Sequence, residues 1–536
     1  MSFIKSIGVW FWLKKKKMQD EEEPLIPLQQ RDQNKGTRTV YKNIDEVIEQ
    51  FDGNGRYQIC LAILVLFAVL FNGYHTLLVY FVANDPGWQC TNITNQSTFC
   101  QHNQGKIFHS SQSDYKRVCT LKRSEWKFAK PKTYSIVTEF DLICSKAYLS
   151  TLSNSLFFAC GAIGSIVAGF VGDKYGRKYP SCVIIFVLAI TGLVSGFVQN
   201  VWVFIILRGL IGALFYSLNN LAFILFVEII VPRYRGIASI AFLISSSVSI
   251  VLLSIIASEV QEWRKLVLYT SLPTFTVAFA SLFVYRSPRW LLPRSPAKAK
   301  QILMKIAAFN KISLGKFDIE QHEDIRDDPK HQYSYKDMFT LSPKAFLIIL
   351  AQFLLWSLGH LLYFAIGYES ALLGGNIYLN LIYVFLADIP GYLILAFINR
   401  YFGHRTLVQY SSLLVAVFIF PIIVLPTKLP NKHTYKVVFA MFSKMFSSMV
   451  TTSMYAWSFE IYPTVIRAQG ITICNIGIGI GSAMTPFLLK YPAMAWTRLP
   501  ILLICLLALL NIVFTFCLPN TKGKPTREKF HELTDD

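Results

Sequence analysis

Three charged residues lie inside long apolar runs of this sequence. Asp388 lies in the run 377–398, Lys444 in the run 436–459 and Arg208 in the run 201–228. A charge is costly in such a run and indicates a pathway for a solute. Asp388 and Lys444 either only neutralise each other between two helices or also face a bound ion. Arg208 is expected to be structural and to hold its helix to its neighbours.

Aromatic residues accompany these charges and make up 15% of the chain. Trp356 and Tyr363 are seven positions apart, so they share one face of a predicted helix at 344–366. Aromatic faces attract organic cations and hold flat apolar molecules by contact. The alternative is packing, or a belt of aromatic rings at the membrane interface.

Two short basic loops repeat in the chain. Gly172-Asp-Lys-Tyr-Gly-Arg-Lys178 joins the apolar runs 148–171 and 179–198, and Asn399-Arg-Tyr-Phe-Gly-His-Arg405 joins the runs 377–398 and 406–426. In the first loop, Asp173 can pair with Arg177 or Lys178 and so form a latch that opens. The alternative is a loop whose basic residues only set the topology and whose acid is accidental.

A second pair of loops repeats with nearly the same offset. Glu228 and Arg235 are seven positions apart, as are Glu460 and Arg467, and the two glutamates are 232 residues apart. Two loop types that recur together indicate an internal duplication. Parallel halves of six helices are typical of transporters.

Apolar runs of about 20 residues are long enough to cross a bilayer as helices. The chain is 53% hydrophobic and 16% charged, whereas soluble domains carry roughly 25% charged residues. The sequence therefore predicts an all-α membrane protein with twelve transmembrane helices in two six-helix halves. The expected segments are a tail at 1–57, a first half at 58–285 with an external loop at 84–146, a linker at 286–342, a second half at 343–518 and a tail at 519–536.

Twelve spans place both termini on one side of the membrane. The basic residues gather in the N-terminal tail and the short loops, which predicts that these are cytoplasmic. The net charge of +20 then follows from topology and does not indicate a nucleic-acid partner. We find no zinc spacing, phosphate-binding loop or nucleophile elbow. We therefore expect no catalytic residue, metal site or cofactor, and membrane lipid as the surroundings.

The external loop contains an even number of cysteines: Cys90, Cys100, Cys119 and Cys144. It also contains two glycosylation sequons, at Asn92 and Asn95. Cysteines beside sequons predict an extracellular or lumenal segment with two disulfides. Three pairings are possible, and the sequence does not choose among them.

The N-terminal tail carries a short acidic stretch followed by two aliphatic residues. Glu21, Leu25 and Ile26 resemble an acidic dileucine sorting signal. A sorting adaptor is therefore a possible partner, and an endosomal or lysosomal membrane is the alternative to the plasma membrane.

Several motifs together carry a family resemblance. The loop 172–178 resembles the signature loop of the major facilitator superfamily, and Arg208-Gly-Leu-Ile-Gly212 resembles its fourth-helix motif. Three further stretches (138–144, 287–292 and 460–467) resemble the organic cation, anion and carnitine transporters of solute carrier family 22. The resemblance covers about residues 55–518. It implies that Asp388 and Lys444 match charged residues of these transporters, and that Tyr216 lies at a cavity position.

Two residues depart from that family pattern. Gly479 stands where relatives often have an acid or an arginine, so the usual selector of substrate charge is missing. Arg400 stands where the second-half loop more usually has an acid. We expect a polyspecific carrier of small organic ions that works by alternating access, with cations or zwitterions favoured over anions and an unknown coupling ion. The alternatives are an organic anion carrier and a transport-inactive receptor or scaffold.

Alternating access requires contacts that open and close, and we expect the basic loops on the cytoplasmic side to provide them. The expected gating pairs are Asp173 with Arg177, Glu228 with Arg235, and Glu460 with Arg467.

Overall fold

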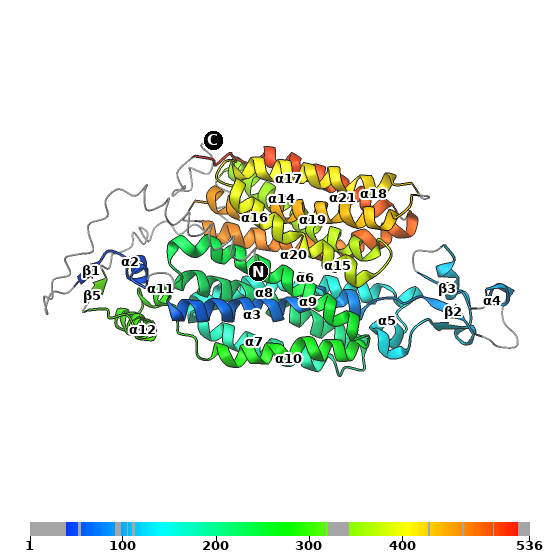
Figure 1. Cartoon of the computed structure of the whole chain (residues 1–536), viewed down its shortest axis with the longest axis horizontal. Helices are drawn as coiled ribbons and strands as arrows, with labels where there is room; N and C mark the ends of the chain where they lie inside the picture. Colours follow the sequence, from blue (N-terminus) through cyan, green and yellow to red (C-terminus); the bar gives the residue numbers. More distant parts are fainter. Residues whose placement is uncertain are drawn as a thin grey trace.

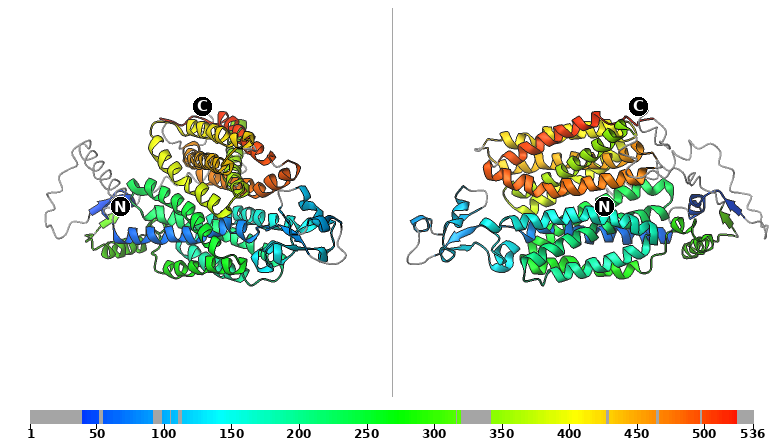
Figure 2. Two further views of the ribbon diagram at one scale, coloured as in Figure 1. Left: turned by 45° about the vertical axis from the view of Figure 1, so that its right-hand side comes forward. Right: turned by 180° about the vertical axis from the view of Figure 1, so that it is seen from behind.

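The computed structural model describes residues 39–51, 55–91, 98–103, 105–109, 113–315, 317–319, 342–426, 429–463, 466–496 and 498–523. Its long helices form two bundles that lie side by side (Figure 1). Figure 2 shows the same two bundles from two further directions. Each bundle comes from one half of the chain, as the repeated loops predict.

The helices of the first bundle are α3 (Arg56–Val82), α6 (Tyr148–Tyr175), α7 (Lys178–Ser195), α8 (Val201–Ile229), α9 (Arg235–Glu259) and α10 (Trp263–Ser281). Those of the second are α14 (Pro343–Leu372), α15 (Ile377–Leu386), α16 (Asp388–Ile398), α17 (His404–Ile419), α18 (Pro421–Val424), α19 (Lys432–Ile461), α20 (Arg467–Ala495) and α21 (Leu499–Phe516).

Eleven helical segments of the described residues are long and apolar enough to cross a membrane. The pairs α15–α16 and α17–α18 each count as one such segment. α10 is the remaining predicted span: it is 19 residues long, contains Pro273, and packs against α3 and α7 within the first bundle. The architecture is therefore the predicted one of two six-helix halves.

Prolines explain why two spans of the second half are broken. The ring of Pro390 conflicts with a helical carbonyl four residues earlier, at Leu386, which is the residue where α15 ends. Pro421 begins α18 in the same way, directly after Phe420. The first break is the important one, because it puts Asp388 at the start of α16, where the helix dipole favours a negative charge.

The disulfide end of the molecule carries a small folded loop. β2 (Trp88–Cys90) pairs with both β3 (Ile107–Phe108) and β4 (Trp126–Phe128) in an antiparallel sheet. Two disulfides, Cys90–Cys100 and Cys119–Cys144, close the loop around the sheet. The short helices α4 (Thr98–His102) and α5 (Ile136–Glu139), with 3-10 turns at Ser113–Cys119, Arg123–Glu125, Lys132–Tyr134 and Cys144–Lys146, complete it.

The opposite end, here called the linker end, carries the segment between the halves. α11 (Pro288–Leu291) and α12 (Pro296–Phe309) lie there, within the predicted linker at 286–342. Nothing in the sequence pattern predicted β1 (Thr39–Tyr41) and α2 (Ile44–Glu49) within the expected tail. β1 pairs in parallel with β5 (Phe317–Ile319), so the N-terminal segment is part of this end. A 3-10 turn at Pro232–Tyr234 lies before α9.

The most extensive contacts between the two halves are made by α6 and α9 of the first half. α6 packs against α20, and α9 packs against α15 and α16. Near the disulfide end, the Lys490 ammonium of α20 donates to the Ala147 carbonyl (2.8 Å) and to Thr151 Oγ1 of α6 (3.1 Å). At the linker end, no ion pair of the described residues joins the first half to the second. Each pair there lies within one half, or within the first half together with the N-terminal segment and the linker.

Candidate functional site

The charged residues predicted inside the membrane meet in one buried cluster. Asp388 and Lys444 have no exposed surface. Tyr363 lies between them: its hydroxyl donates to Asp388 Oδ2 (2.8 Å), and its backbone carbonyl accepts from Lys444 Nζ (2.9 Å). Tyr363 therefore joins α14, α16 and α19 around both charges.

Asp388 and Lys444 are not in direct contact. Among the ion pairs of the described residues, none joins these two side chains, although they are close enough to influence each other electrostatically. The Lys444 ammonium instead lies over the rings of Tyr363 and Phe385, 4.3 Å from the centre of the latter. Such faces stabilise a desolvated cation. The interpretation that the two charges only neutralise each other through contact is therefore not what the geometry favours.

The carboxylate of Asp388 is only partly satisfied. Oδ2 accepts from Tyr363 and also from Ser247 Oγ of α9 at 3.0 Å. Oδ1 is buried and has no hydrogen-bond partner within the described part of the chain. Since an unpaired buried carboxylate oxygen is costly, this atom is the natural point of attachment for a ligand that donates or is positively charged.

The predicted aromatic residues lie in different environments. Trp356 is fully buried; its indole N–H donates to Ser458 Oγ (2.8 Å), and its ring packs edge-on against Tyr455. This geometry gives Trp356 a supporting role behind Tyr455. Tyr216 is partly exposed and lies against Gly161 so closely that a Cβ on that glycine would be 2.3 Å from its ring.

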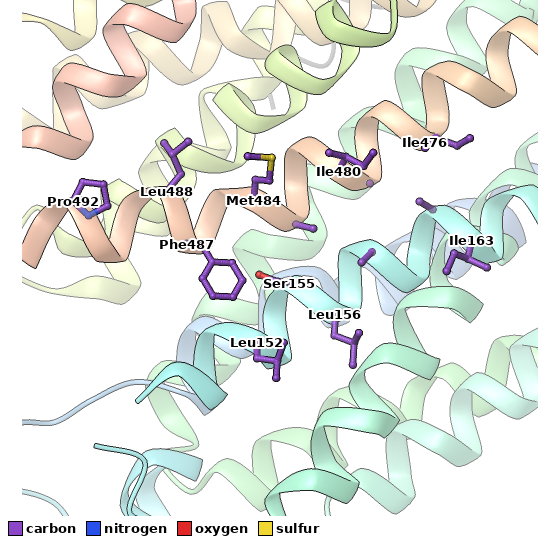
Figure 3. Close-up of a pocket in the computed structure, with 14 residues that line it drawn as sticks. Leu152, Ser155, Leu156, Ile163, Ile476, Ile480, Met484, Phe487, Leu488 and Pro492 are labelled. Carbon is purple, nitrogen blue, oxygen red and sulfur yellow. The ribbon is translucent and has the colours of Figure 1, made fainter. Parts of the chain in front are cut away.

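Gly479 does not lie in the Asp388 cluster but at the contact between α20 and α6. A Cβ on Gly479 would come within 2.3 Å of the Ala162 methyl group, so this glycine permits the close approach of the two helices. Beside it is a groove of about 770 Å³ whose lining includes Leu156, Ile163 and Met484 (Figure 3). The lining is almost wholly apolar, so the groove offers a charged solute no counter-charge.

Arg208 joins three helices of the first half. Its side chain is buried, donates to the His75 carbonyl of α3 (3.0 Å) and lies over the Phe157 ring of α6. These contacts are structural, and none of them reaches the Asp388 cluster.

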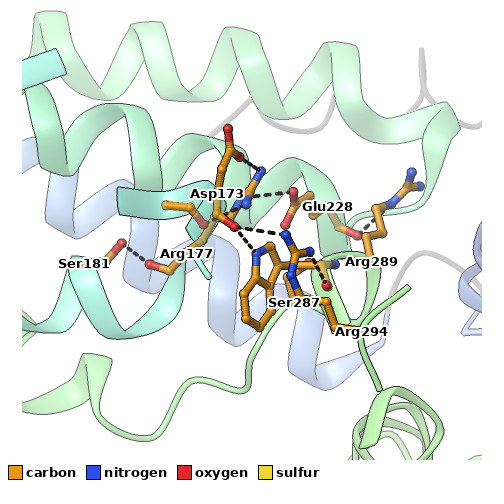
Figure 4. A network of polar contacts seen from close by, with 9 residues as sticks. Asp173, Arg177, Ser181, Glu228, Ser287, Arg289 and Arg294 are labelled. Carbon is orange, nitrogen blue, oxygen red and sulfur yellow. Dashed lines mark hydrogen bonds and ion pairs between the residues drawn. The ribbon is translucent and has the colours of Figure 1, made fainter. Parts of the chain in front are cut away.

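The linker end of the first half holds a network centred on Arg177 (Figure 4). Its guanidinium lies 2.8 Å from Asp173 Oδ1 and 3.3 Å from Glu228 Oε1, and it donates to the Gly172 carbonyl. Trp290 and Arg294 of the linker both donate to the backbone carbonyl of Asp173. Lys178 takes no part in the network and donates to the Leu282 carbonyl.

Two of the three predicted gating pairs are not formed among the described residues. Glu228 pairs with Arg177 instead of Arg235. Arg177 follows Gly176, whose positive φ ends α6. Arg235 instead pairs with Asp45 of α2 (2.7 Å).

In the second half, Glu460 pairs with His404 (3.3 Å) and accepts from Thr521 (2.6 Å). Arg467 donates to the Tyr462 carbonyl (3.1 Å) instead.

Arg289 brings the N-terminal segment into the same network. It pairs with Asp45, as Arg235 does, and donates to the Glu228 carbonyl (3.2 Å). Partial burial lowers the pKa of the Arg289 guanidinium. Asp45 thus connects α2, the linker and the start of α9, and no sequence motif pointed to it.

The loop at the disulfide end is ordered by its disulfides and by a buried phenol. The structure selects Cys90–Cys100 and Cys119–Cys144 from the three pairings that the sequence left open. The Tyr115 hydroxyl donates to the Asp85 carboxylate, and burial and this neighbouring charge raise the pKa of the phenol. Asn92 and Asn95 lie outside the described residues, as do Glu21, Leu25 and Ile26.

Ser247 and Lys490 are functional candidates that the sequence reasoning missed. The sequence contains a weak signal for Ser247, because an apolar run is interrupted there by four serines, at positions 245, 246, 247 and 249. Lys490 stands near the end of a run, where a lysine is ordinary.

Comparison with known proteins agrees with this geometry. The family described as "Sugar (and other) transporter" matches residues 61–533. Solute carrier family 22 member 1 of Bos taurus is 30% identical over 404 residues, which cover 74% of this chain and 70% of the relative. Organic anion transporter 3 of Oryctolagus cuniculus is 26% identical over 510 residues, which cover 91% and 93% of the two chains.

Solved structures show the same fold. The xylose transporter XylE from E. coli, in an inward open conformation, matches with a TM-score of 0.58 at 14% identity over 88% of this chain and 98% of that chain. The fold is thus that of the major facilitator superfamily of membrane transporters. The chain belongs to the sugar (and other) transporter family within it, and its relatives include solute carrier family 22. It is a multi-pass membrane protein, and the proteins it resembles are transporters.

Proposed function

We propose that this protein carries small organic ions across a membrane by alternating access, and that it prefers organic cations or zwitterions to anions. The observation that carries the proposal is the buried Oδ1 of Asp388, which has no hydrogen-bond partner among the described residues and lies in a cluster with aromatic rings. A cation that enters the cluster gains a counter-charge there.

The opposite preference has less support. The Lys444 ammonium already donates to the Tyr363 carbonyl and is covered by two aromatic rings. An organic anion would have to displace these contacts. The relatives include both cation and anion carriers by name, so an anion carrier remains the alternative within the family.

Uptake into proteoliposomes tests this preference with three probes: tetraethylammonium, a carnitine-like zwitterion and an aromatic carboxylate. We expect Asp388→Asn to reduce uptake of the quaternary ammonium at least ten-fold, because the variant loses the negative charge of the cluster. Glu369→Gln is the control for loss of a buried acid outside the cluster, since Glu369 is also buried in the second half and its Oε2 likewise has no partner among the described residues. Carboxylate uptake that survives Asp388→Asn and is lost in Lys444→Ala would show that the protein is an anion carrier.

A third outcome separates the transporter from the other alternative. If folded protein takes up none of the three probes, the receptor or scaffold interpretation is favoured. Gly479 and Arg400 are the residues that support that alternative, because each departs from the usual pattern at a functional position.

The same proposal includes the orientation and the membrane. The linker end, with its basic loops, faces the cytoplasm together with both termini, and the disulfide end faces outward. The plasma membrane is the proposed location, with sorting through Glu21, Leu25 and Ile26 as the alternative. Replacing Leu25 and Ile26 with Ala should move any internal pool to the surface. A glycosidase should increase gel mobility if Asn92 or Asn95 is modified.

A further inference from the structure

A buried polar contact joins the two halves in the middle of the apolar bundles. Ser247 of α9 belongs to the first half, and its hydroxyl donates to Asp388 Oδ2 of the second half at 3.0 Å. Both side chains are buried, with 1% and 0% of their surface exposed. α9 packs along α15 and α16 at this point. The acid of the proposed substrate site therefore also holds the two halves together.

The remaining contacts of Asp388 show how a ligand would act on this bond. Oδ2 accepts from both Ser247 and Tyr363, whereas Oδ1 has no hydrogen-bond partner within the described part of the chain. A cation at Oδ1 would draw negative charge away from Oδ2. Since a hydrogen bond to a charged acceptor is about twice as strong as a neutral one, neutralising the acceptor weakens the bond from Ser247.

We propose that the Ser247 hydroxyl couples the occupancy of Asp388 to the contact between the two halves. With an empty site the bond holds α9 against α15 and α16. A bound cation weakens the bond and lets the halves move. Ser247 is then a positioning residue that acts through Asp388, and this role rests on the proposed function of Asp388 as the substrate counter-charge.

This coupling predicts a specific kinetic behaviour. The empty carrier should change conformation more slowly than the loaded carrier, because only the empty carrier must break the full bond between the halves. Substrate on the far side of the membrane should therefore accelerate transport. Linkage requires the reverse effect as well: removing the bond should strengthen cation binding in the state in which the halves are joined.

The test compares Ser247→Val with Ser247→Thr, which have nearly the same shape but differ in the hydroxyl. Ser249→Ala is the control on the same helix, because Ser249 faces Gly73 of α3 within the first half. Proteoliposomes are loaded with or without unlabelled tetraethylammonium, and uptake of the labelled ion is measured. We expect far-side substrate to stimulate wild type, Ser247→Thr and Ser249→Ala. In Ser247→Val the stimulation should fall about ten-fold or disappear, since a hydrogen bond to a charge affects an equilibrium by about this factor.

A second measurement does not depend on transport. Phe81 of α3 stacks on Tyr378, which lies in the first turn of α15, so a cysteine in place of Phe81 reports separation of the two halves at this contact. Without substrate, an impermeant maleimide should label Phe81→Cys about ten-fold faster in the Ser247→Val background than in the Ser247→Thr background. Equal labelling in the two backgrounds would overturn the coupling. If labelling is faster in Ser247→Val but no variant transports tetraethylammonium, the result supports the Ser247 bond between the halves. The same result rejects the proposed function.

Discussion

The two repeated loops at the linker end hold the same ion pair with different bases. In the first half, Arg177 Nε lies 3.3 Å from Glu228 Oε1; in the second half, His404 Nε2 lies 3.3 Å from Glu460 Oε1. Each base directly follows the loop glycine, Gly176 or Gly403. Arginine is always charged, whereas histidine is charged only when protonated. The duplication has thus kept the geometry, while only the first half has a permanent charge at this position.

The first-half ion pair is also more buried than the second-half pair and has an additional acid beside it. In the first half, Arg177 and Glu228 are only 15% and 17% exposed, and Asp173 adds a second acid. In the second half, Glu460 is 41% exposed. Arg400 occupies the position of Asp173 and lies over the Phe397 and Tyr401 rings. The first-half network should therefore contribute more to the conformational equilibrium than the second.

The largest effect is expected from Arg177→Gln. This change leaves Glu228 half-enclosed without its base, and losing one partner of a buried pair costs about 3–5 kcal/mol at full burial. We expect transport at matched surface expression to fall more than ten-fold. Lys174→Gln, which removes a neighbouring positive charge that lies only over the Tyr175 ring, should leave transport near wild type.

A double variant sharpens this prediction. Arg177→Gln combined with Glu228→Gln removes the uncompensated acid and should recover part of the lost transport. Normal turnover in Arg177→Gln alone would mean that the first-half network does not control the cycle.

A smaller effect is expected from Asp173→Asn. The Asp173 carboxylate is 73% exposed, and such surface ion pairs contribute roughly 0–1 kcal/mol. Its backbone carbonyl, which accepts from Trp290 and Arg294, is unchanged by the substitution. We expect uptake to fall less than about three-fold, and the difference from wild type to shrink further in high salt. A loss as large as that of Arg177→Gln would assign the main gating role to Asp173.

Much of this fold could be predicted from sequence because its determinants are local. The length of each apolar run predicted the spans, although the breaks in the runs 377–398 and 406–426 were not expected. The loop repeat predicted the two halves, and the even number of cysteines predicted the two disulfides. Each of these inferences depends on residues close together in the chain.

The partners of the charged residues could not be predicted in the same way. Glu228 has a base seven positions later in Arg235, but it pairs with Arg177, which lies on another helix connection. Ser247 meets Asp388 only because the two halves pack together. Asp45 lies in a segment that looked like a tail, and its two arginine partners are contributed by α9 and the linker. Such pairs depend on packing between distant segments, which hydrophobic periodicity does not specify.

The smallest effect is expected when the second loop is converted to the chemistry of the first. Arg400→Asp with His404→Arg places an acid and a permanent base at the positions that correspond to Asp173 and Arg177. An exposed pair of this kind contributes at most about 1 kcal/mol, so the rise in thermal unfolding temperature should be only a few degrees. The substituted pair replaces a histidine, which is charged only when protonated, with an arginine, which is always charged. Arg400→Asp alone is the control and should destabilise, since it adds an acid to this loop without a permanent base. An unchanged unfolding temperature in the double variant would show that a permanent base at this position does not distinguish the two halves.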